Sequence, residues 1–116
     1  MQFMLMIYAY PDQGPEPGTE EHNQMMASYF AFSQEVEQKG IMISGSALLG
    51  PEEARTVTIS DGKTNIADGP AVDTRPFFGG YYILECADLS EAQEYAARIP
   101  TAAFGAVEVR PLMVFD

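Results

Sequence analysis

The sequence has few of the residues that build disulfides and metal centres. Cys86 is its one cysteine, His22 is its one histidine, and tryptophan is absent. A single cysteine excludes an intrachain disulfide and a multi-cysteine metal site, and zinc sites usually recruit several His or Cys ligands. Cys86 ends the apolar run YYILEC, which is typical of a thiol at the end of a strand rather than of a nucleophile. We therefore expect no metal and no other cofactor.

Basic residues are also scarce. Six Lys and Arg stand against 17 Asp and Glu, which gives a net charge of -11. Such a surface repels phosphate backbones and anionic lipids, so we expect neither a nucleic-acid nor a membrane partner, while a cationic protein partner stays open. No apolar run reaches transmembrane length. MQFMLMIYAY lacks the basic start and cleavage site of a signal peptide, so we expect a cytoplasmic protein.

The size of the chain predicts a single domain over residues 1–116, of which 47% are hydrophobic. A core of this size is adequate but small, and oligomerisation is the usual supplement. The periodicity of apolar residues and the turn signals then predict the following elements. In the first half of the chain they are a strand at 3–9 buried on both faces, a helix from an N-cap at Thr19 to about Lys39, and a strand at 41–49 that breaks at Gly45. A hairpin of 55–60 and 63–68 around Asp61-Gly62 follows, and then a strand at 77–86. The chain ends with a helix at 89–99, with Ser90 and Gln93 as a capping box, and a strand at 106–115 with Pro111 at an edge or a bulge.

This order is that of a ferredoxin-like α+β sandwich, βαβ(ββ)βαβ, with one inserted hairpin. Two helices would cover one face of an antiparallel sheet and leave apolar strand faces open. A second copy is the simplest cover, so we expect a homodimer packed sheet to sheet, or a larger homo-oligomer.

Several motifs occur along the whole chain in the order and spacing of one family. They are MLMIYA near the start, DGKTNIADGP in the middle, GGYYIL about ten residues later, and then DLSEAQEYAARIP and VEVRPL. In these motifs the chain resembles the YCII-related proteins, specifically their DGPF branch. It departs from the branch at Ala71, where the name implies Phe, and Phe77-Phe78 place aromatic side chains further downstream.

The resemblance implies a dimeric α/β barrel built from ferredoxin-like subunits. Some relatives are discussed as small-molecule enzymes that use a His-Asp pair. Genes of the branch often neighbour those of extracytoplasmic-function sigma factors, which suggests a regulatory link.

Asp68 and His22 are the candidate catalytic residues. Asp68 could act as a general base or orient a histidine, or its Asp-Gly-Pro motif could simply form a turn. His22 falls on the same helical stripe as Met26, Tyr29 and Ser33, which predicts that it faces the sheet. It could then exchange protons with Asp68 in a cleft between the sheet and the first helix, or be a histidine satisfied by a structural hydrogen bond.

Arg55, Tyr81 and Arg110 are the candidate substrate-binding residues. Either arginine, if it faces the interior, would indicate an anionic ligand, whereas outward-facing arginines would only solubilise their strands. Tyr81 and Tyr82 are adjacent in a strand, so their side chains must point to opposite faces. These residues favour an enzyme of the lyase, isomerase or hydrolase type, or a binder of a small organic molecule. The alternative is a non-catalytic oligomeric module with a regulatory or protein-binding role.

Overall fold

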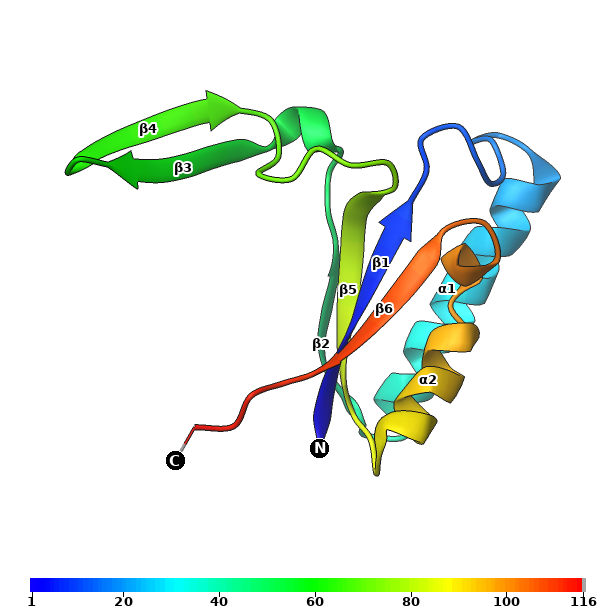
Figure 1. The fold of residues 1–116 in the computed structure, drawn as a ribbon. Helices are drawn as coiled ribbons and strands as arrows, with labels where there is room; N and C mark the ends of the chain where they lie inside the picture. Colours follow the sequence, from blue (N-terminus) through cyan, green and yellow to red (C-terminus); the bar gives the residue numbers. More distant parts are fainter. Residues whose placement is uncertain (116) are drawn as a thin grey trace.

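The computed structural model describes residues 1–115, which form a four-stranded sheet, a separate two-stranded hairpin and two α-helices (Figure 1). In chain order the elements are β1 (Gln2–Ala9), α1 (Glu20–Gln38), β2 (Met42–Ala47), the short 3-10 helix η1 (Pro51–Glu53), β3 (Arg55–Ser60), β4 (Lys63–Asp68), β5 (Phe77–Glu85), α2 (Leu89–Ala97), the 3-10 helix η2 (Pro100–Ala103) and β6 (Ala106–Pro111). The predicted order of strands and helices is confirmed. Among these residues, no helix is long and apolar enough to cross a membrane.

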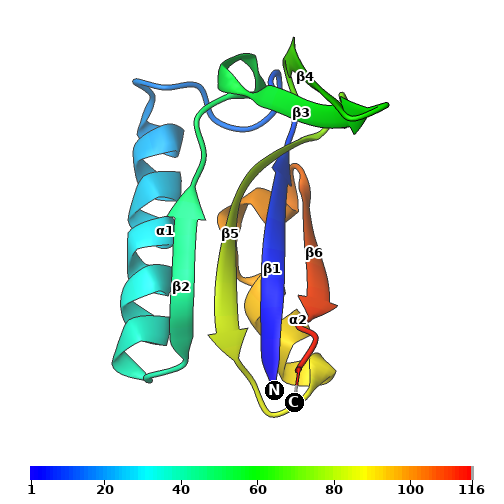
Figure 2. The ribbon, with the colours of Figure 1, turned by 90° about the vertical axis from the view of Figure 1, so that its left-hand side faces the viewer.

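The sheet has the strand order β2-β5-β1-β6, and every neighbouring pair is antiparallel. Figure 2 shows the four strands in this order, and in Figure 1 both helices lie on one side of them. This is the ferredoxin-like arrangement that the sequence predicts. It brings β1 to the centre of the sheet and leaves β2 and β6 at its edges.

The core lies between the helices and the sheet. Phe3, Leu5 and Ile7 alternate along β1 and are buried against a cluster that includes Phe32 and Val36 of α1. Alternate residues of a strand point to opposite faces, and the intervening residues of β1 are half-buried. The prediction that this strand is buried on both faces is therefore wrong for the single chain, because the helices cover one face only.

The inserted hairpin stands apart from the sheet. β3 and β4 pair only with each other, and Figure 1 shows them projecting from the sheet on the side away from the helices. Asp61 and Gly62 at its tip have φ values of 51° and 75°, as the predicted type I′ turn requires. Val57, Ile59 and Ile66 are 61%, 73% and 70% exposed. The hairpin thus presents apolar side chains that no other part of residues 1–115 covers.

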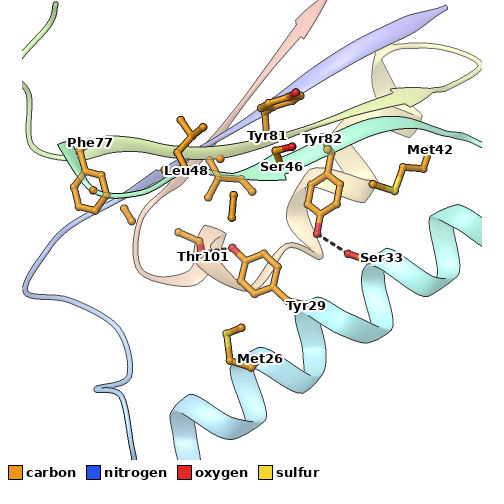
Figure 3. Close-up of a pocket in the computed structure, with 17 residues that line it drawn as sticks. Met26, Tyr29, Ser33, Met42, Ser46, Leu48, Phe77, Tyr81, Tyr82 and Thr101 are labelled. Atoms are coloured by element: carbon orange, nitrogen blue, oxygen red, sulfur yellow. Dashed lines mark hydrogen bonds between the residues drawn. The ribbon is translucent and has the colours of Figure 1, made fainter. Parts of the chain in front are cut away.

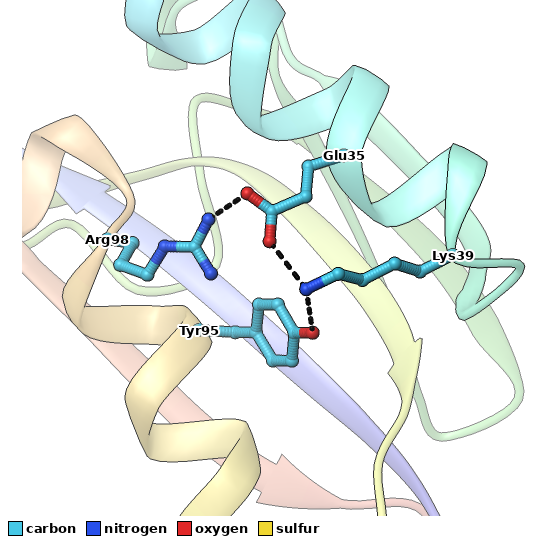
Figure 4. A network of polar contacts seen from close by, with 4 residues as sticks. All are labelled: Glu35, Lys39, Tyr95 and Arg98. Carbon is cyan, nitrogen blue, oxygen red and sulfur yellow. Dashed lines mark hydrogen bonds and ion pairs between the residues drawn. The ribbon is translucent and has the colours of Figure 1, made fainter.

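A polar network holds the C-terminal turns of the two helices together (Figure 4). Glu35 of α1 accepts hydrogen bonds from Lys39, at 2.9 Å, and from Arg98, which follows α2. Lys39 also donates to the Tyr95 hydroxyl at 3.2 Å. The hydrogen bonds from Arg98 and Lys39 lower the pKa of Glu35 to about 2. The network therefore links the C-terminal ends of α1 and α2.

The structure confirms the predicted N-cap of α1 but not the predicted N-terminal cap of α2. The N–H of His22 donates to Oγ1 of Thr19 at 3.2 Å, which confirms Thr19 as an N-cap. At α2 the N-cap is Asp88, whose carboxylate accepts from the N–H of Glu91 at 2.9 Å. The predicted capping box of Ser90 and Gln93 is wrong by two residues, because Asp88 and Glu91 have the same spacing and make the contacts instead.

The sheet has two irregularities of register. β2 runs through Gly45 without a break, and its register shifts between Met42 and Ser44, so the predicted break at Gly45 is wrong. The register of β1 with β5 skips Gly79, which forms a bulge. Pro111 ends β6, an edge strand, as predicted.

Candidate functional site

A cavity of about 590 Å³ lies between α1 and the sheet, where a cleft was predicted (Figure 3). Met26, Tyr29 and Ser33 of α1 line one wall. Their spacing of three and four residues places them on one face of the helix. The remaining lining comes mainly from β2, the residues after it and the first half of β5: Ile7, Ala9, Met42, Gly45, Ser46, Ala47, Leu48, Gly50, Phe77, Gly79, Gly80, Tyr81, Tyr82 and Thr101. We call this space the α1 cavity.

Small residues keep the α1 cavity open. β2 contributes Gly45, Ser46 and Ala47 to its wall, and β5 contributes Gly79 and Gly80. These side chains are too short to fill the space beneath α1. A Cβ at Gly80 would lie 2.9 Å from the carbonyl oxygen of Ser46, so glycine also allows β2 and β5 to pair closely here.

Two pairs of hydroxyl groups are the polar features of the cavity (Figure 3). The hydroxyls of Tyr29 and Thr101 are hydrogen-bonded, and Oγ of Ser33 lies 2.8 Å from the hydroxyl of Tyr82. Burial raises the pKa of Tyr29, so its hydroxyl keeps its proton at neutral pH. Each pair joins a residue of α1 to the other side of the cavity. They can therefore orient a ligand from both walls.

The lining of the α1 cavity contains no Asp, Glu, Lys, Arg or His. Apart from the two hydroxyl pairs, the polar side chains of the lining are Ser46, which is exposed, and Tyr81, whose ring lies on the far side of the sheet from α1. No group of three or more His, Cys, Asp and Glu side chains within residues 1–115 is placed to hold a metal ion. The chemistry available in the cavity is thus hydrophobic contact and hydrogen bonding by neutral hydroxyls.

Asp68, the first predicted catalytic residue, ends β4 in the hairpin. Its carboxylate pairs with Nε of Arg55 at 3.2 Å, and its side chain is 92% exposed. It does not line the α1 cavity. The neighbouring Gly69 has a φ of 98°, so Asp-Gly-Pro serves as a turn here. A role of Asp68 in proton transfer stays a prediction.

His22, the second predicted catalytic residue, lies in the first turn of α1 and is half-buried. It sits one turn before Met26 on the same helical face, next to the cavity lining but outside it. Figure 1 shows α1 on one side of the sheet and β4 on the other. The single chain therefore does not bring His22 and Asp68 together, and the pair stays a prediction.

The structure places two of the predicted substrate-binding residues, the arginines, outside the cavity and the third, Tyr81, in its wall. The side chains of Arg55 and Arg110 are 54% and 67% exposed, and Arg110 pairs with Glu108 of its own strand. Both arginines face outward. Of the two predicted alternatives, this is the one in which they only solubilise their strands. Tyr81 belongs to the cavity wall, but Figure 3 shows its ring on the far side of the sheet from α1. Tyr82 points toward α1 and is buried, so the opposite orientation of the two tyrosines is confirmed.

Sequence reasoning missed Thr101 as a site residue. It lies in η2, is 5% exposed, and meets Tyr29 across the cavity. The only sequence signal is a threonine directly after Pro100, which ends a helix; nothing in that spacing points to α1. Ser33 and Tyr29 were visible on the helical stripe, and their stripe does face the sheet.

Comparisons with known proteins agree with this architecture. The YCII-related domain matches residues 1–116. An uncharacterized protein of Rhizobium meliloti (strain 1021) is 31% identical over 98 residues, which cover 83% of this chain and 79% of that protein. Among solved structures, 5-chloro-2-hydroxyhydroquinone dehydrochlorinase (TftG) from Burkholderia phenoliruptrix AC1100, in complex with 2,5-dihydroxybenzoquinone, is similar with a TM-score of 0.55 and 17% identity, over 97% of this chain and 94% of that one. The chain belongs to the YCII-related family.

Proposed function

We propose that this protein binds a small organic molecule in the α1 cavity and catalyses a reaction of it. The cavity itself carries the proposal. Its volume of about 590 Å³ falls within the range of about 300–1,000 Å³ that is usual for ligand sites. Its apolar walls and few hydroxyl groups are also typical of such sites, in which hydrophobic contact gives affinity and a few polar groups fix orientation.

The structural neighbour supports the catalytic part of the proposal. It is a dehydrochlorinase that holds a dihydroxybenzoquinone, so this fold can support chemistry on a small ring compound. At 17% identity it shows the fold alone. We therefore propose the class of ligand, a small organic molecule, and not the reaction.

We assign proton transfer to His22, because it is the histidine next to the cavity and imidazole is the commonest group for general acid-base work. Asp68 is its proposed partner only from a second copy, since β4 projects to the open side of the sheet. His22→Gln and Asp68→Asn should then each lower turnover without lowering ligand affinity. If both variants keep full turnover, the assignment is wrong.

We also propose that a second copy covers the open face of the sheet. Met4, Met6 and Tyr8 of β1 and Tyr81 and Ile83 of β5 alternate with buried residues, are half-buried, and have no helix over them. Contiguous apolar surface of this kind usually marks an interface.

Light scattering coupled to gel filtration tests this interface. A dimer is expected for the wild type, and Met6→Lys should shift it toward monomer. Phe30→Lys is the control, because Phe30 is 66% exposed on α1, away from the sheet. A monomeric wild type, or equal effects of the two changes, would contradict the proposed interface.

Two serines of α1 test the proposed function. Ser33 lines the cavity, whereas Ser28 is exposed on the same helix and does not. Ser33→Phe should place a ring in the cavity beside Tyr82 and reduce the thermal stabilisation given by any ligand found in a screen of small ring compounds. Ser28→Phe should leave that stabilisation unchanged. Equal behaviour of the two variants would place the ligand elsewhere, and a ligand that binds but is never converted would favour the non-catalytic module.

A further inference from the structure

We infer that the ligand of the α1 cavity is an uncharged, mostly apolar compound that carries carbonyl or similar oxygen acceptors. This inference rests on the proposed function, because it concerns the occupant of the same cavity. It differs from the anionic ligand that inward-facing arginines would have indicated.

The absence of charged side chains from the lining excludes a good site for an ion. A buried charge without a partner costs several kcal/mol, since neither water nor a counter-ion replaces its hydration. Arg55 and Arg110 are paired with Asp68 and Glu108 on the outside and offer no cation to the cavity. The net charge of -11 makes the surroundings still less favourable for an anion.

The hydroxyl pairs indicate which polar groups the ligand carries. In a hydrogen-bonded pair of hydroxyls, one O–H donates to the other oxygen, and the second O–H stays free. The two pairs are Tyr29 with Thr101 and Ser33 with Tyr82. Among the hydrogen bonds of residues 1–115, none has one of these four hydroxyls donating to a backbone carbonyl or to a third side chain. Each pair therefore keeps one proton to donate. A ligand with neutral oxygen acceptors would pair with these protons, and the burial that raises the pKa of Tyr29 keeps its proton in place.

Three compounds of nearly equal shape separate the possibilities: acetophenone carries a neutral carbonyl, benzoate carries a charge, and ethylbenzene carries neither. Binding is followed by two-dimensional amide NMR of the wild type, with Ser33→Phe to identify shifts that come from the cavity. Acetophenone should bind more tightly than ethylbenzene, by about 2- to 12-fold for each hydrogen bond gained. Benzoate should bind at least about tenfold more weakly than acetophenone.

The double variants Ser33→Ala/Tyr82→Phe and Tyr29→Phe/Thr101→Val test the hydroxyls directly, since each keeps the aromatic ring and removes both protons of one pair. At least one variant should lose about 2- to 12-fold in affinity for acetophenone and keep its affinity for ethylbenzene. If benzoate binds as well as acetophenone at the site that Ser33→Phe blocks, the inference is wrong although the proposed function stands. Unchanged acetophenone affinity in both double variants also overturns it. If none of the three compounds shifts the cavity amides at millimolar concentration, the proposed function itself fails.

Discussion

Replacing Gly80 by alanine should force β2 away from β5, whereas the same change at Gly79 should be tolerated. The added Cβ at Gly80 would lie 2.9 Å from the carbonyl oxygen of Ser46 and 3.3 Å from Cα of Ala47. Both are backbone atoms, so no side-chain rotation relieves the contact. At Gly79 the nearest atom is Cε2 of Phe77 at 3.6 Å, an ordinary van der Waals contact.

These distances determine how much each substitution should change the free energy of unfolding. One methyl group forced into a tightly packed place costs about 1–3 kcal/mol. Glycine to alanine at a compatible backbone position stabilises by about 0.4–1 kcal/mol, because the unfolded chain loses freedom. This gain is common to both variants, so their free energies of unfolding should differ by about 1–3 kcal/mol, with Gly80→Ala the less stable.

Urea unfolding followed by far-ultraviolet circular dichroism measures this difference. Because Ser46 and Ala47 also line the α1 cavity, Gly80→Ala should in addition weaken ligand binding, which amide NMR detects. Equal stabilities of the two variants, or a larger loss at Gly79, would refute the argument that close pairing of β2 and β5 depends on Gly80.

Three other changes test the remaining structure. Glu35→Gln should lower the free energy of unfolding at neutral pH. The pKa of Glu35 is lowered from 4.5 to about 2 in the folded protein. Its ion pairs therefore stabilise the fold above about pH 4.5, and this stabilisation is lost as the pH falls toward 2. Urea unfolding across this pH range should show a shallower pH dependence for the variant than for the wild type, and an unchanged slope would contradict the role of the network. Leu5→Ala, at a side chain that is 0% exposed, should cost about 2–5 kcal/mol in the same assay, and a loss below about 1 kcal/mol would argue against its place in the core. Cys86 is buried and burial raises the pKa of its thiol, so a thiol reagent should modify it slowly in the folded protein and quickly in urea; fast modification of the folded protein would show that the thiol is accessible.

Local patterns in the sequence predicted the elements well because each pattern acts over a few residues. Apolar alternation, the cap at Thr19 and the Asp61-Gly62 turn fix strands, helix start and hairpin without help from distant residues. The wrong predictions arose because a local pattern does not include the effect of neighbouring or distant residues. Two capping patterns overlap at α2, Asp88 with Glu91 and Ser90 with Gln93, and the structure uses the first. At Gly45, pairing with β5 kept a strand intact where the local sequence indicated a break.

The candidate site was less predictable because it is made of contacts between distant segments. Tyr29 and Thr101 are 72 residues apart, and Ser33 and Tyr82 are 49 apart. Asp68 stood out in the sequence through a local turn motif, and the structure places it on an exposed hairpin. A turn motif reports the conformation of its own backbone and says nothing about which cavity lies beside it.

The sequence alone thus determined the ferredoxin-like order of strands and helices, the family resemblance and the face of α1 that lies against the sheet. Only the tertiary structure decided that this face meets small residues of β2 and β5, that two hydroxyl pairs span the gap, and that the arginines face outward. The physical reason is that an element is specified by the periodicity of its own residues. A cavity is specified by the volume that side chains from several elements leave unfilled, and that quantity exists only once the elements have packed.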